Sequence, residues 1–339
     1  MGPDPFTSVE TRSIPPQERG AALLTVLLLV AILSVITAVA LERLTLASRM
    51  TRNLVSADQG RAYLLAAEQA AGVQLGDMIK SRPDRTTLAG GWLGTPQILP
   101  LPGGQAVARV RDAGNCFNLN SVVSGGGMDG KMVARPEGIA QFSALMRLLG
   151  VDRLVADQIA VSTADWIDED NVPGPGGAED EYYSRIDPPY LTANNLIADP
   201  SELRVINGVS ADVYQRVRPW VCALPETALS PININTLLPD QAVLLAMLVP
   251  DKLPIERARQ VLAQRPADGY GSLNTFWAQP ALASLGLGQS GTEQTRLTSR
   301  WLEVALTVDL GGDQVDETVL YDAAQQPARL VRRVRGEGG

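Results

Sequence analysis

The densest group of chemically active side chains in the sequence is an acidic window between Asp165 and Asp187. It holds eight acidic residues against the single base Arg185, which nearly accounts for the net charge of −8 of the whole chain. Carboxylates packed this densely repel one another unless a cation or water screens them. The interruption at residues 172–177, of sequence VPGPGG, allows the chain to fold back on itself. The window is therefore either a solvated acidic loop or a cation site.

A cation site would draw its ligands from the two sides of this fold-back. The first-choice ligands are Asp168, Asp170, Glu179 and Asp180, with Asp165 and Asp187 as weaker candidates. Calcium takes six to eight oxygens from carboxylates, carbonyls and water, and it tolerates irregular geometry. The window is not an EF-hand, because Val172 stands where the third alternate ligand should be.

The composition disfavours several other chemistries. The chain has no histidine and only two cysteines, Cys116 and Cys222, which argues against His-based triads and zinc sites. Two carboxylates can serve a glycosidase, but no substrate cleft is recognisable in the sequence. The acidic balance argues against nucleic-acid binding, which needs clustered Lys and Arg. We therefore predict no catalytic residues and no enzymatic activity.

The N-terminal region predicts a membrane helix behind a polar leader. Residues 21–41 carry no charge, and in a helix they would span about 30 Å, the thickness of a hydrocarbon core. No secretory cleavage site follows, and the sequence stays compatible with a helix to about Ile79. The Arg19-Gly20 junction resembles that of type IV prepilin-like proteins, which a membrane peptidase cuts after the glycine, here between Gly20 and Ala21. A plain single-span anchor is the alternative.

The remaining pattern predicts an α+β fold in which a helical segment interrupts one small antiparallel sheet. Residues 105–112 alternate apolar and polar side chains, and strand patterns return only near the C-terminus, at 301–310, 317–321 and 328–334. Residues 311–313 (GGD) predict a hairpin turn. Helical spacing fills the interval, at 139–149, 151–167, 201–207, 212–217, 236–247 and 255–263. Because sheet neighbours are normally close in sequence, an inserted helical domain is the simplest reading.

Several local runs are specific enough to indicate a family. Beside the leader junction, they are CFNLN at 116–120, DWIDEDNVPGPGGAEDEYY at 165–183, DPPY at 187–190, SELRVINGV at 201–209, VCALPE at 221–226 and ININT at 232–236. Together they resemble the minor pseudopilin K family of type II secretion systems (the GspK family), over nearly the whole chain after the leader.

The resemblance implies a long N-terminal helix packed on a small antiparallel pseudopilin sheet, a large inserted all-α domain, and a calcium site in that domain. The expected divisions are a leader at 1–20, a helix at 21–80 with its membrane part at 21–41, a split pseudopilin domain at 81–122 and 298–335, and an inserted domain at 123–297. With this resemblance, calcium becomes the preferred interpretation of the acidic window.

The resemblance also implies a structural role. The family's subunit sits at the tip of a short periplasmic pseudopilus, where it primes or caps assembly for the export of folded proteins across the outer membrane. The expected partners are the minor pseudopilins of types I and J, the prepilin peptidase and the bacterial inner membrane, with secreted substrates as a further candidate and no nucleic acid. The chain would cross the membrane once, with its C-terminal bulk in the periplasm. The alternative is a membrane-anchored, calcium-dependent periplasmic module that captures secreted substrates.

Two further expectations follow from this topology. Cys116 and Cys222 would both lie in the oxidising periplasm, so we expect a disulfide rather than two buried thiols. The fifth residue after the cut is Thr25, where most pilins and pseudopilins carry a glutamate thought to neutralise the free amine of the subunit ahead. A threonine there fits a subunit that has no predecessor, and drift at a permissive position is the alternative.

Overall fold

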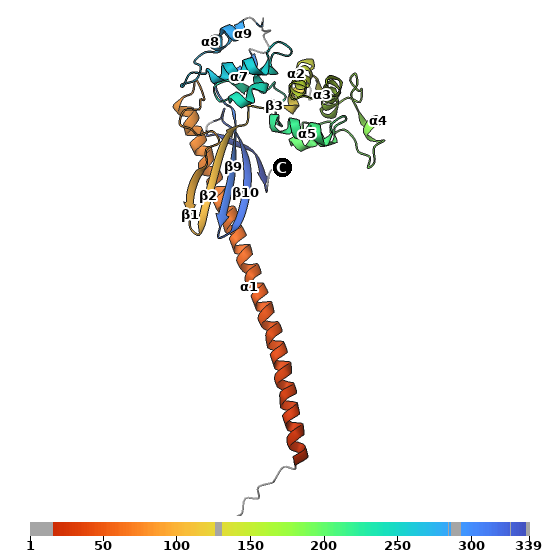
Figure 1. Ribbon diagram of the computed structural model, residues 1–339, viewed down its shortest axis with the longest axis vertical. Coiled ribbons are helices and arrows are strands. Elements are labelled where there is room, and N and C mark those ends of the chain that lie inside the picture. Colours follow the sequence, from red (N-terminus) through yellow and green to blue (C-terminus); the bar gives the residue numbers. More distant parts are fainter. Residues whose placement is uncertain (1–15, 126–130, 284, 286–292, 326, 337–339) are drawn as a thin grey trace, which may run out of the picture. The chain divides into compact units, whose positions relative to one another are not determined.

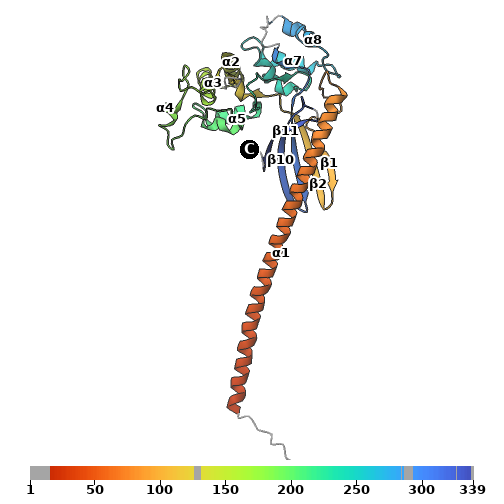
Figure 2. The same ribbon diagram turned by 180° about the vertical axis from the view of Figure 1, so that it is seen from behind.

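The computed structural model describes residues 16–125, 131–283, 285, 293–325 and 327–336 (Figures 1 and 2). The predicted leader lies outside the described residues up to position 15, and side chains are described from Ala21 onward. The chain divides into two compact units, residues 1–59 and 60–339. Each unit is described by itself.

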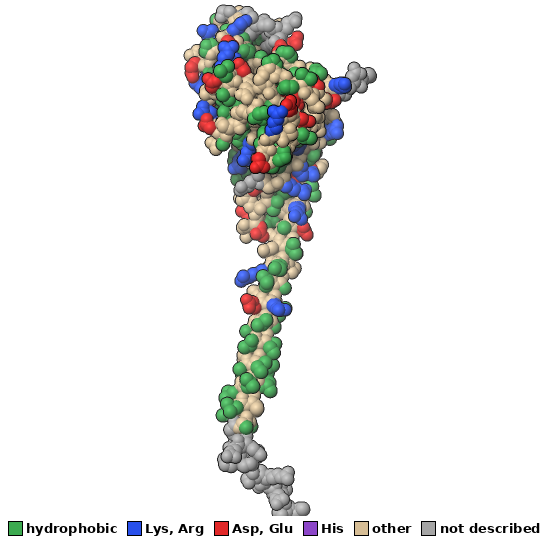
Figure 3. Space-filling view, turned by 90° about the vertical axis from the view of Figure 1, so that its right-hand side faces the viewer, with side chains coloured by type: hydrophobic (Ala, Val, Ile, Leu, Met, Phe, Trp, Pro, Cys, Tyr) green, Lys and Arg blue, Asp and Glu red, His purple; other side chains and the backbone are tan. Residues whose placement is uncertain are grey.

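Helix α1 (Pro16–Ser81) begins in the first unit, where it has the length and composition of a membrane span. Its most apolar window has a mean hydropathy of 2.9. All side chains of residues 21–41 are exposed, and Figure 3 shows hydrophobic side chains without charged ones along this stretch. Thr25 donates its hydroxyl to the carbonyl of Ala22 at 2.8 Å, so the polar group is satisfied within the helix. An exposed apolar surface of this length suits a lipid environment.

The second unit is built on a five-stranded antiparallel sheet of order β1-β2-β9-β10-β11 (Figure 1). Its strands are β1 (Gln97–Leu101), β2 (Gly104–Asp112), β9 (Trp301–Leu310), β10 (Asp313–Asp322) and β11 (Arg329–Arg335). The four strands that the sequence predicts are confirmed, and β9 and β10 are joined through Gly311 and Gly312, both at positive φ. Strand β1 is additional to the prediction. It is a five-residue edge strand with Pro100 in it and a nearly uniformly exposed pattern, so no alternation marks it.

The C-terminal turns of α1 cover one face of this sheet (Figure 2). Leu64 and Leu75 are buried there among the inward side chains of β9 and β10. A Cβ on Gly72 would lie 3.2 Å from Cε1 of Tyr321, so the helix approaches the sheet closely where its sequence has a glycine. The Tyr321 hydroxyl in turn donates to the backbone carbonyl of Glu68 at 2.7 Å. The expected packing of the long helix on the sheet is confirmed.

Between β2 and β9 the chain forms a mostly helical segment, residues 117–296, called the inserted block below. Its helices are α2 (Pro136–Leu148), α3 (Arg153–Ile167), α4 (Asp180–Tyr183), α5 (Ala211–Val217), α6 (Ala242–Ala246), α7 (Ile255–Ala263), α8 (Leu273–Trp277) and α9 (Pro280–Ala283). Its 3-10 turns are η1 (Leu119–Val122), η2 (Pro200–Val205), η3 (Arg218–Trp220) and η4 (Pro239–Gln241). Its short strands are β3 (Phe117–Asn118), β4 (Val123–Gly125), β5 (Met132–Ala134), β6 (Val221–Cys222), β7 (Ile232–Asn233) and β8 (Thr295–Arg296).

Two of the helices expected in this block are shorter than the sequence pattern suggests. The segment 201–207 is the 3-10 turn η2, and 236–247 is the turn η4 followed by the short helix α6. Each begins with a proline, Pro200 or Pro239, which suits a first helical position. Gly208, at a φ of 86°, follows η2 closely and prevents its extension.

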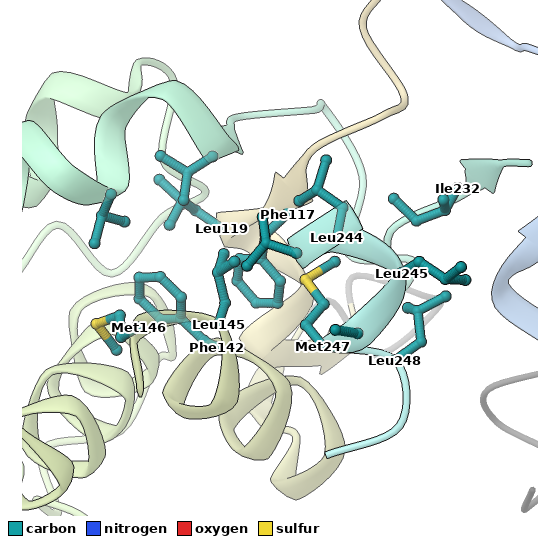
Figure 4. Close-up of a cluster of buried hydrophobic side chains, with 14 of the residues drawn as sticks. Phe117, Leu119, Phe142, Leu145, Met146, Ile232, Leu244, Leu245, Met247 and Leu248 are labelled. Atoms are coloured by element: carbon teal, nitrogen blue, oxygen red, sulfur yellow. The ribbon is translucent and has the colours of Figure 1, made fainter. Parts of the chain in front are cut away.

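The inserted block has its own hydrophobic core, whose centre is drawn in Figure 4. Phe117 of β3 and Phe142 of α2 stack with their ring centroids 4.8 Å apart. Leu145 from α2, Leu244 from α6 and the adjacent Met247 are fully buried around them. A separate cluster of buried side chains fills the space between α1 and the sheet. The block is therefore held together by its own side chains.

A buried polar network joins the block to the sheet at Asp112, the last residue of β2. Oδ2 of Asp112 accepts hydrogen bonds from the hydroxyls of Thr236, at 2.5 Å, and of Ser299, and Oδ1 accepts one from the N–H of Gly114 at 3.0 Å. The Asn233 side chain donates to the Ser299 hydroxyl at 2.8 Å. Burial raises the pKa of Asp112, and these hydrogen bonds oppose the rise. Asp112, Asn233, Thr236 and Ser299 are called the polar joint below.

A disulfide between Cys116 and Cys222 strengthens the same region, as the sequence predicts. The two Cα atoms are 5.8 Å apart, and the bond spans 106 residues of sequence. Cys116 precedes β3, and Cys222 lies in β6, which pairs with β3. In the chain-entropy model, a cross-link that closes a loop of this length contributes about 4–5 kcal/mol.

Replacing Asp112 by alanine should lower the free energy of unfolding by about 3 kcal/mol, because two buried hydroxyls and one N–H lose their acceptor. Asp313→Ala is the matched control, since Asp313 is exposed at the β9–β10 turn, and it should change the same quantity by less than about 0.5 kcal/mol. Urea denaturation followed by tryptophan fluorescence measures both. Equal effects of the two substitutions would contradict the role assigned to the polar joint.

Candidate metal site

Three acidic side chains converge where the loop after α3 folds back to the start of α4. Asp168 is the C-terminal cap of α3, Asp170 lies two residues further, and Glu179 is the N-terminal cap of α4. One carboxylate oxygen from each lies within 4.8 Å of the other two. Three of the four first-choice ligands are thus brought together, and they are called the carboxylate cluster below.

Asp165 has a different position, since it holds the loop closed. Its carboxylate accepts hydrogen bonds from the N–H groups of Gly174, at 3.1 and 3.2 Å, and of Ala178, at 2.8 Å. The backbone comes so close that a Cβ on Gly177 would lie 1.8 Å from Oδ2 of Asp165. The glycines of the VPGPGG run therefore allow the fold-back, and Asp165 fixes it from the last turn of α3.

The other two candidate ligands lie apart from the carboxylate cluster. Oδ1 of Asp180 accepts hydrogen bonds from the N–H of Thr192, at 2.9 Å, and from its hydroxyl, at 2.7 Å. Those hydrogen bonds lower the pKa of Asp180. Asp187 is exposed and precedes Pro188 through a cis peptide bond. Asp180 therefore anchors the segment after α4 instead of facing the cluster.

Aromatic side chains fix the two helix ends that carry the cluster. Trp166, in the last turn of α3, meets Tyr183 of α4 edge to face, with ring centroids 5.4 Å apart. Tyr190 stacks on Tyr183 at 5.2 Å, and the Tyr183 hydroxyl accepts a hydrogen bond from the N–H of Asn207. Because these rings are packed, Asp168 and Glu179 are held at defined positions.

Two of the three clustered carboxyl groups are buried without partners. Asp168 is 4% exposed and Glu179 3% exposed, whereas Asp170 is exposed. Oδ1 of Asp168 and both carboxylate oxygens of Glu179 are buried and accept no hydrogen bond from the described residues. Buried polar atoms are nearly always paired, so unpaired acceptors that face one another suit a positively charged partner.

The pKa values of Asp168 and Glu179 are raised by the same burial. Burial raises the pKa of Asp168 to about 7, and repulsion from Asp170 and Asp165 adds to the rise. Burial also raises the pKa of Glu179 to about 8, and repulsion from neighbouring acids, Asp165 first, adds to it. Without a cation, the site therefore retains protons near neutral pH. A bound cation would displace them and stabilise the ionised carboxylates.

The donor set favours a hard divalent cation. Only oxygen ligands are present in the cluster, the chain contains no histidine, and both cysteines are in the disulfide. Calcium prefers oxygen ligands and accepts irregular geometry, whereas magnesium demands a regular octahedron and retains its water. The carboxylate cluster therefore fits calcium, with Asp168, Asp170 and Glu179 as ligands.

Sequence reasoning missed the residues that shape this site without joining it. The closing role of Asp165 depends on the close approach of the loop to α3. The role of Thr192 depends on its hydrogen bond to Asp180, twelve residues earlier in the sequence. The one available signal was the pair of glycines, Gly174 and Gly177, on either side of Pro175, which indicates a tight fold-back.

Comparison with known proteins gives consistent results over most of the chain. Two family models described as type II secretion system protein K match residues 115–226 and 232–298. The type II secretion system protein K of Pectobacterium carotovorum subsp. carotovorum is 34% identical over 320 residues, which cover 94% of this chain and 97% of that protein. The Klebsiella pneumoniae protein of the same name is 39% identical over 266 residues, covering 78% and 81%.

The fold has a solved counterpart. A chain in the crystal structure of the GspK-GspI-GspJ complex from the enterotoxigenic Escherichia coli type 2 secretion system superposes with a TM-score of 0.74 and 32% identity. The match covers 85% of this chain and 99% of the other. The family models, the identity over almost the full length and the shared fold agree, and this chain belongs to the type II secretion system protein K family.

Proposed function

We propose that this protein is a structural minor pseudopilin at the tip of the type II secretion pseudopilus, where it primes or caps assembly with minor pseudopilins of types I and J. The observation that carries the proposal is the match to a chain of the GspK-GspI-GspJ complex, which covers 99% of that chain. The family is one of structural secretion components, and the role proposed here needs no catalysis. Assembly then serves the export of folded proteins across the outer membrane.

The N-terminal region supports membrane insertion before assembly. The apolar part of α1 would cross the bacterial inner membrane once and leave the second unit in the periplasm, where a disulfide is stable. The prepilin peptidase would remove the leader between Gly20 and Ala21. Positive charge at Arg19 lies on the side expected to stay cytoplasmic.

Two independent features support a place at the tip. The inserted block joins the sheet at the end where β2 finishes and β9 begins, so it adds bulk beyond that end of the sheet. A subunit within the shaft must accept a neighbour above it, and the block would occupy that space. Thr25 also lacks the charge that would neutralise a predecessor's amine, and it avoids placing an unpaired carboxylate in the membrane.

Calcium at the carboxylate cluster is part of the proposal. The ion would supply the positive charge that Asp168 and Glu179 lack, and it would hold the loop between α3 and α4 in one conformation. Its role here is structural, because it fixes a surface of the inserted block that is available to partners or secreted substrates.

Calcium should raise the midpoint of thermal unfolding, because it binds the folded state alone. The double variant Asp168→Asn/Glu179→Gln should lose this shift. In chelator above about pH 8 it should be at least as stable as the unchanged protein, in which two buried carboxylates without partners are then ionised. Glu169→Gln is the matched control, since it removes one exposed charge from the same loop and should keep the shift. A calcium shift that persists in the double variant would mean that the loop is merely solvated.

The calcium-free protein should lose stability as the pH rises from about 4 to about 8. The pKa values of about 7 for Asp168 and about 8 for Glu179 lie above those of an unfolded chain, so the folded state binds more protons in this window. The stability that proton binding at Asp168 and Glu179 contributes is complete below about pH 4 and is lost above about pH 8. Calcium should stabilise most at the upper end, where its ligands are ionised. Thermal midpoints at several pH values, with chelator and with calcium, test this, and a calcium effect that is equal at all of them would refute it.

The tip position can be tested by cysteine crosslinking between the N-terminal helix of this protein and those of the other minor pseudopilins. We expect one set of neighbours, on the membrane side only, and no crosslink between copies of this chain. Thr25→Glu should leave the folding of the second unit unchanged but reduce assembly, because the added carboxylate has no amine to pair with. A subunit found directly above this one, or copies repeated along the shaft, would exclude the tip.

A further inference from the structure

A cleft of about 690 Å³ lies between the inserted block and the face of the sheet opposite α1. Alternate residues of a strand point to opposite faces, so Val304 packs toward α1 while Glu303 and Ala305 face the cleft. The opposite wall comes from the start of η2, at Asp199, and from η3, at Arg218. The cleft is within the second unit and is separate from the carboxylate cluster.

The strand register arranges the floor of this cleft in two rows across β2, β9, β10 and β11, in that order. The front row is Arg109, Ala305, Thr318 and Val334. The rear row is Arg111, Glu303, Leu320 and Arg332. All of these residues line the cleft. Ala305 is exposed in the front row, whereas Leu320 is 2% exposed and packs with Leu224 of the block, so the front row is the accessible floor.

Positive charge stands at both ends of the floor. Arg109 and Arg111 are on β2 at one end, and Arg332 is on β11 at the other. Arg218, Arg332 and Asp199 all line the cleft. Burial raises the pKa of Asp199, but hydrogen bonds from Ser201 and the charges of Arg218 and Arg332 lower it on balance. The lining of the cleft has four arginines against Asp112, Asp199 and Glu303, which is a small positive excess in a protein of net charge −8.

Arg332 and Arg111 are held in place by contacts within the protein, whereas Arg109 is not. Nη1 of Arg332 donates to the carbonyls of Ala198, at 2.7 Å, and Ala223, at 3.1 Å, which fixes the guanidinium without neutralising it. Arg111 forms an ion pair with Glu303 at 2.5 Å. Arg109 is exposed and forms no ion pair or hydrogen bond within the described residues. Arg109 therefore has no carboxylate partner among the described residues, whereas Arg332 has Asp199 nearby but forms no ion pair with it.

We propose that this cleft binds an extended acidic polypeptide segment of another protein. Across the sheet, Arg109 and Arg332 are three strand spacings apart, which is about 14 Å, and Arg332 is offset by two residues along its strand, in the rear row. An extended chain advances about 3.3 Å per residue, so carboxylates four residues apart would reach both ends from the same face of the segment. The small side chains of Ala305 and Thr318 leave room for the backbone between them. The inference does not depend on calcium or on a place at the tip.

The test uses the full-length protein in non-ionic detergent and a fluorescein-labelled peptide with two glutamates four positions apart among valine, serine and threonine. Fluorescence anisotropy should show saturable binding that weakens with salt. A peptide with adjacent glutamates should bind at least about fivefold more weakly. Arg109→Glu should weaken binding of the spaced peptide by about tenfold or more and improve binding of its lysine counterpart.

Arg257→Glu is the matched control, since Arg257 is an exposed arginine of α7 that does not line the cleft. It should change the dissociation constant by less than about twofold. Equal weakening by the two reversals would overturn the proposal, as would no binding of the spaced peptide at about millimolar concentration. Displacement by inorganic phosphate beyond that by chloride at equal ionic strength would overturn it in favour of a small-anion site. Light scattering that shows self-association of the unchanged protein, lost in Arg109→Glu, would make a second copy the occupant.

Discussion

The polar joint fixes the position of the inserted block on the sheet, together with the apolar cluster of Leu224, Trp301 and Leu320. Only two short connections, after Asp112 and before Trp301, link the block to the sheet, and connections this short would otherwise act as hinges. Asn115 adds to the joint, since its amide donates to the Thr236 hydroxyl at 3.0 Å and its oxygen accepts from the N–H of Asn233. A buried network of this kind has few arrangements in which every group is satisfied. The cleft keeps its shape for this reason, because the sheet forms its floor and the block forms its wall.

The fold could be predicted from the sequence wherever periodicity carried the information. The alternation of 105–112 and of 301–310 is clear because one face of these strands packs against α1 while the other is partly open. Strand β1 has no such pattern, since it depends on β2 for its pairing and is exposed on both faces. The asparagines of the CFNLN run identified a family but not a role. Asn120 exchanges hydrogen bonds with the backbone of Ile197, a contact 77 residues away that no local pattern encodes.

For the carboxylate cluster too, the local sequence predicted some features, and others depend on contacts made only in the folded loop. The residue types and the glycine-rich interruption were enough to predict that Asp168, Asp170 and Glu179 lie close together. The assignment of Asp165 and Asp180 needed knowledge of which backbone N–H groups they meet, which follows only from the folded loop. The basic ends of the cleft were not predicted, because they come to lie on one face only once β2 pairs with β9, β9 with β10, and β10 with β11. Each arginine taken alone resembles an ordinary surface residue.

The insertion between β2 and β9 also constrains the order in which the molecule can form. These strands are adjacent in the sheet but separated in sequence by the whole inserted block, so closing them before the block has folded costs a large loop entropy. The block has its own core, and the disulfide joins Cys222 in the block to Cys116 just before it, so the block can become compact first and bring the ends of the two strands together. Strands β9, β10 and β11 follow the inserted block in the sequence, so they emerge after it during synthesis. The apolar face of α1 near Leu64 and Leu75 therefore stays uncovered until these strands have been made, and a chain caught at this stage is the form most exposed to chaperones and proteases.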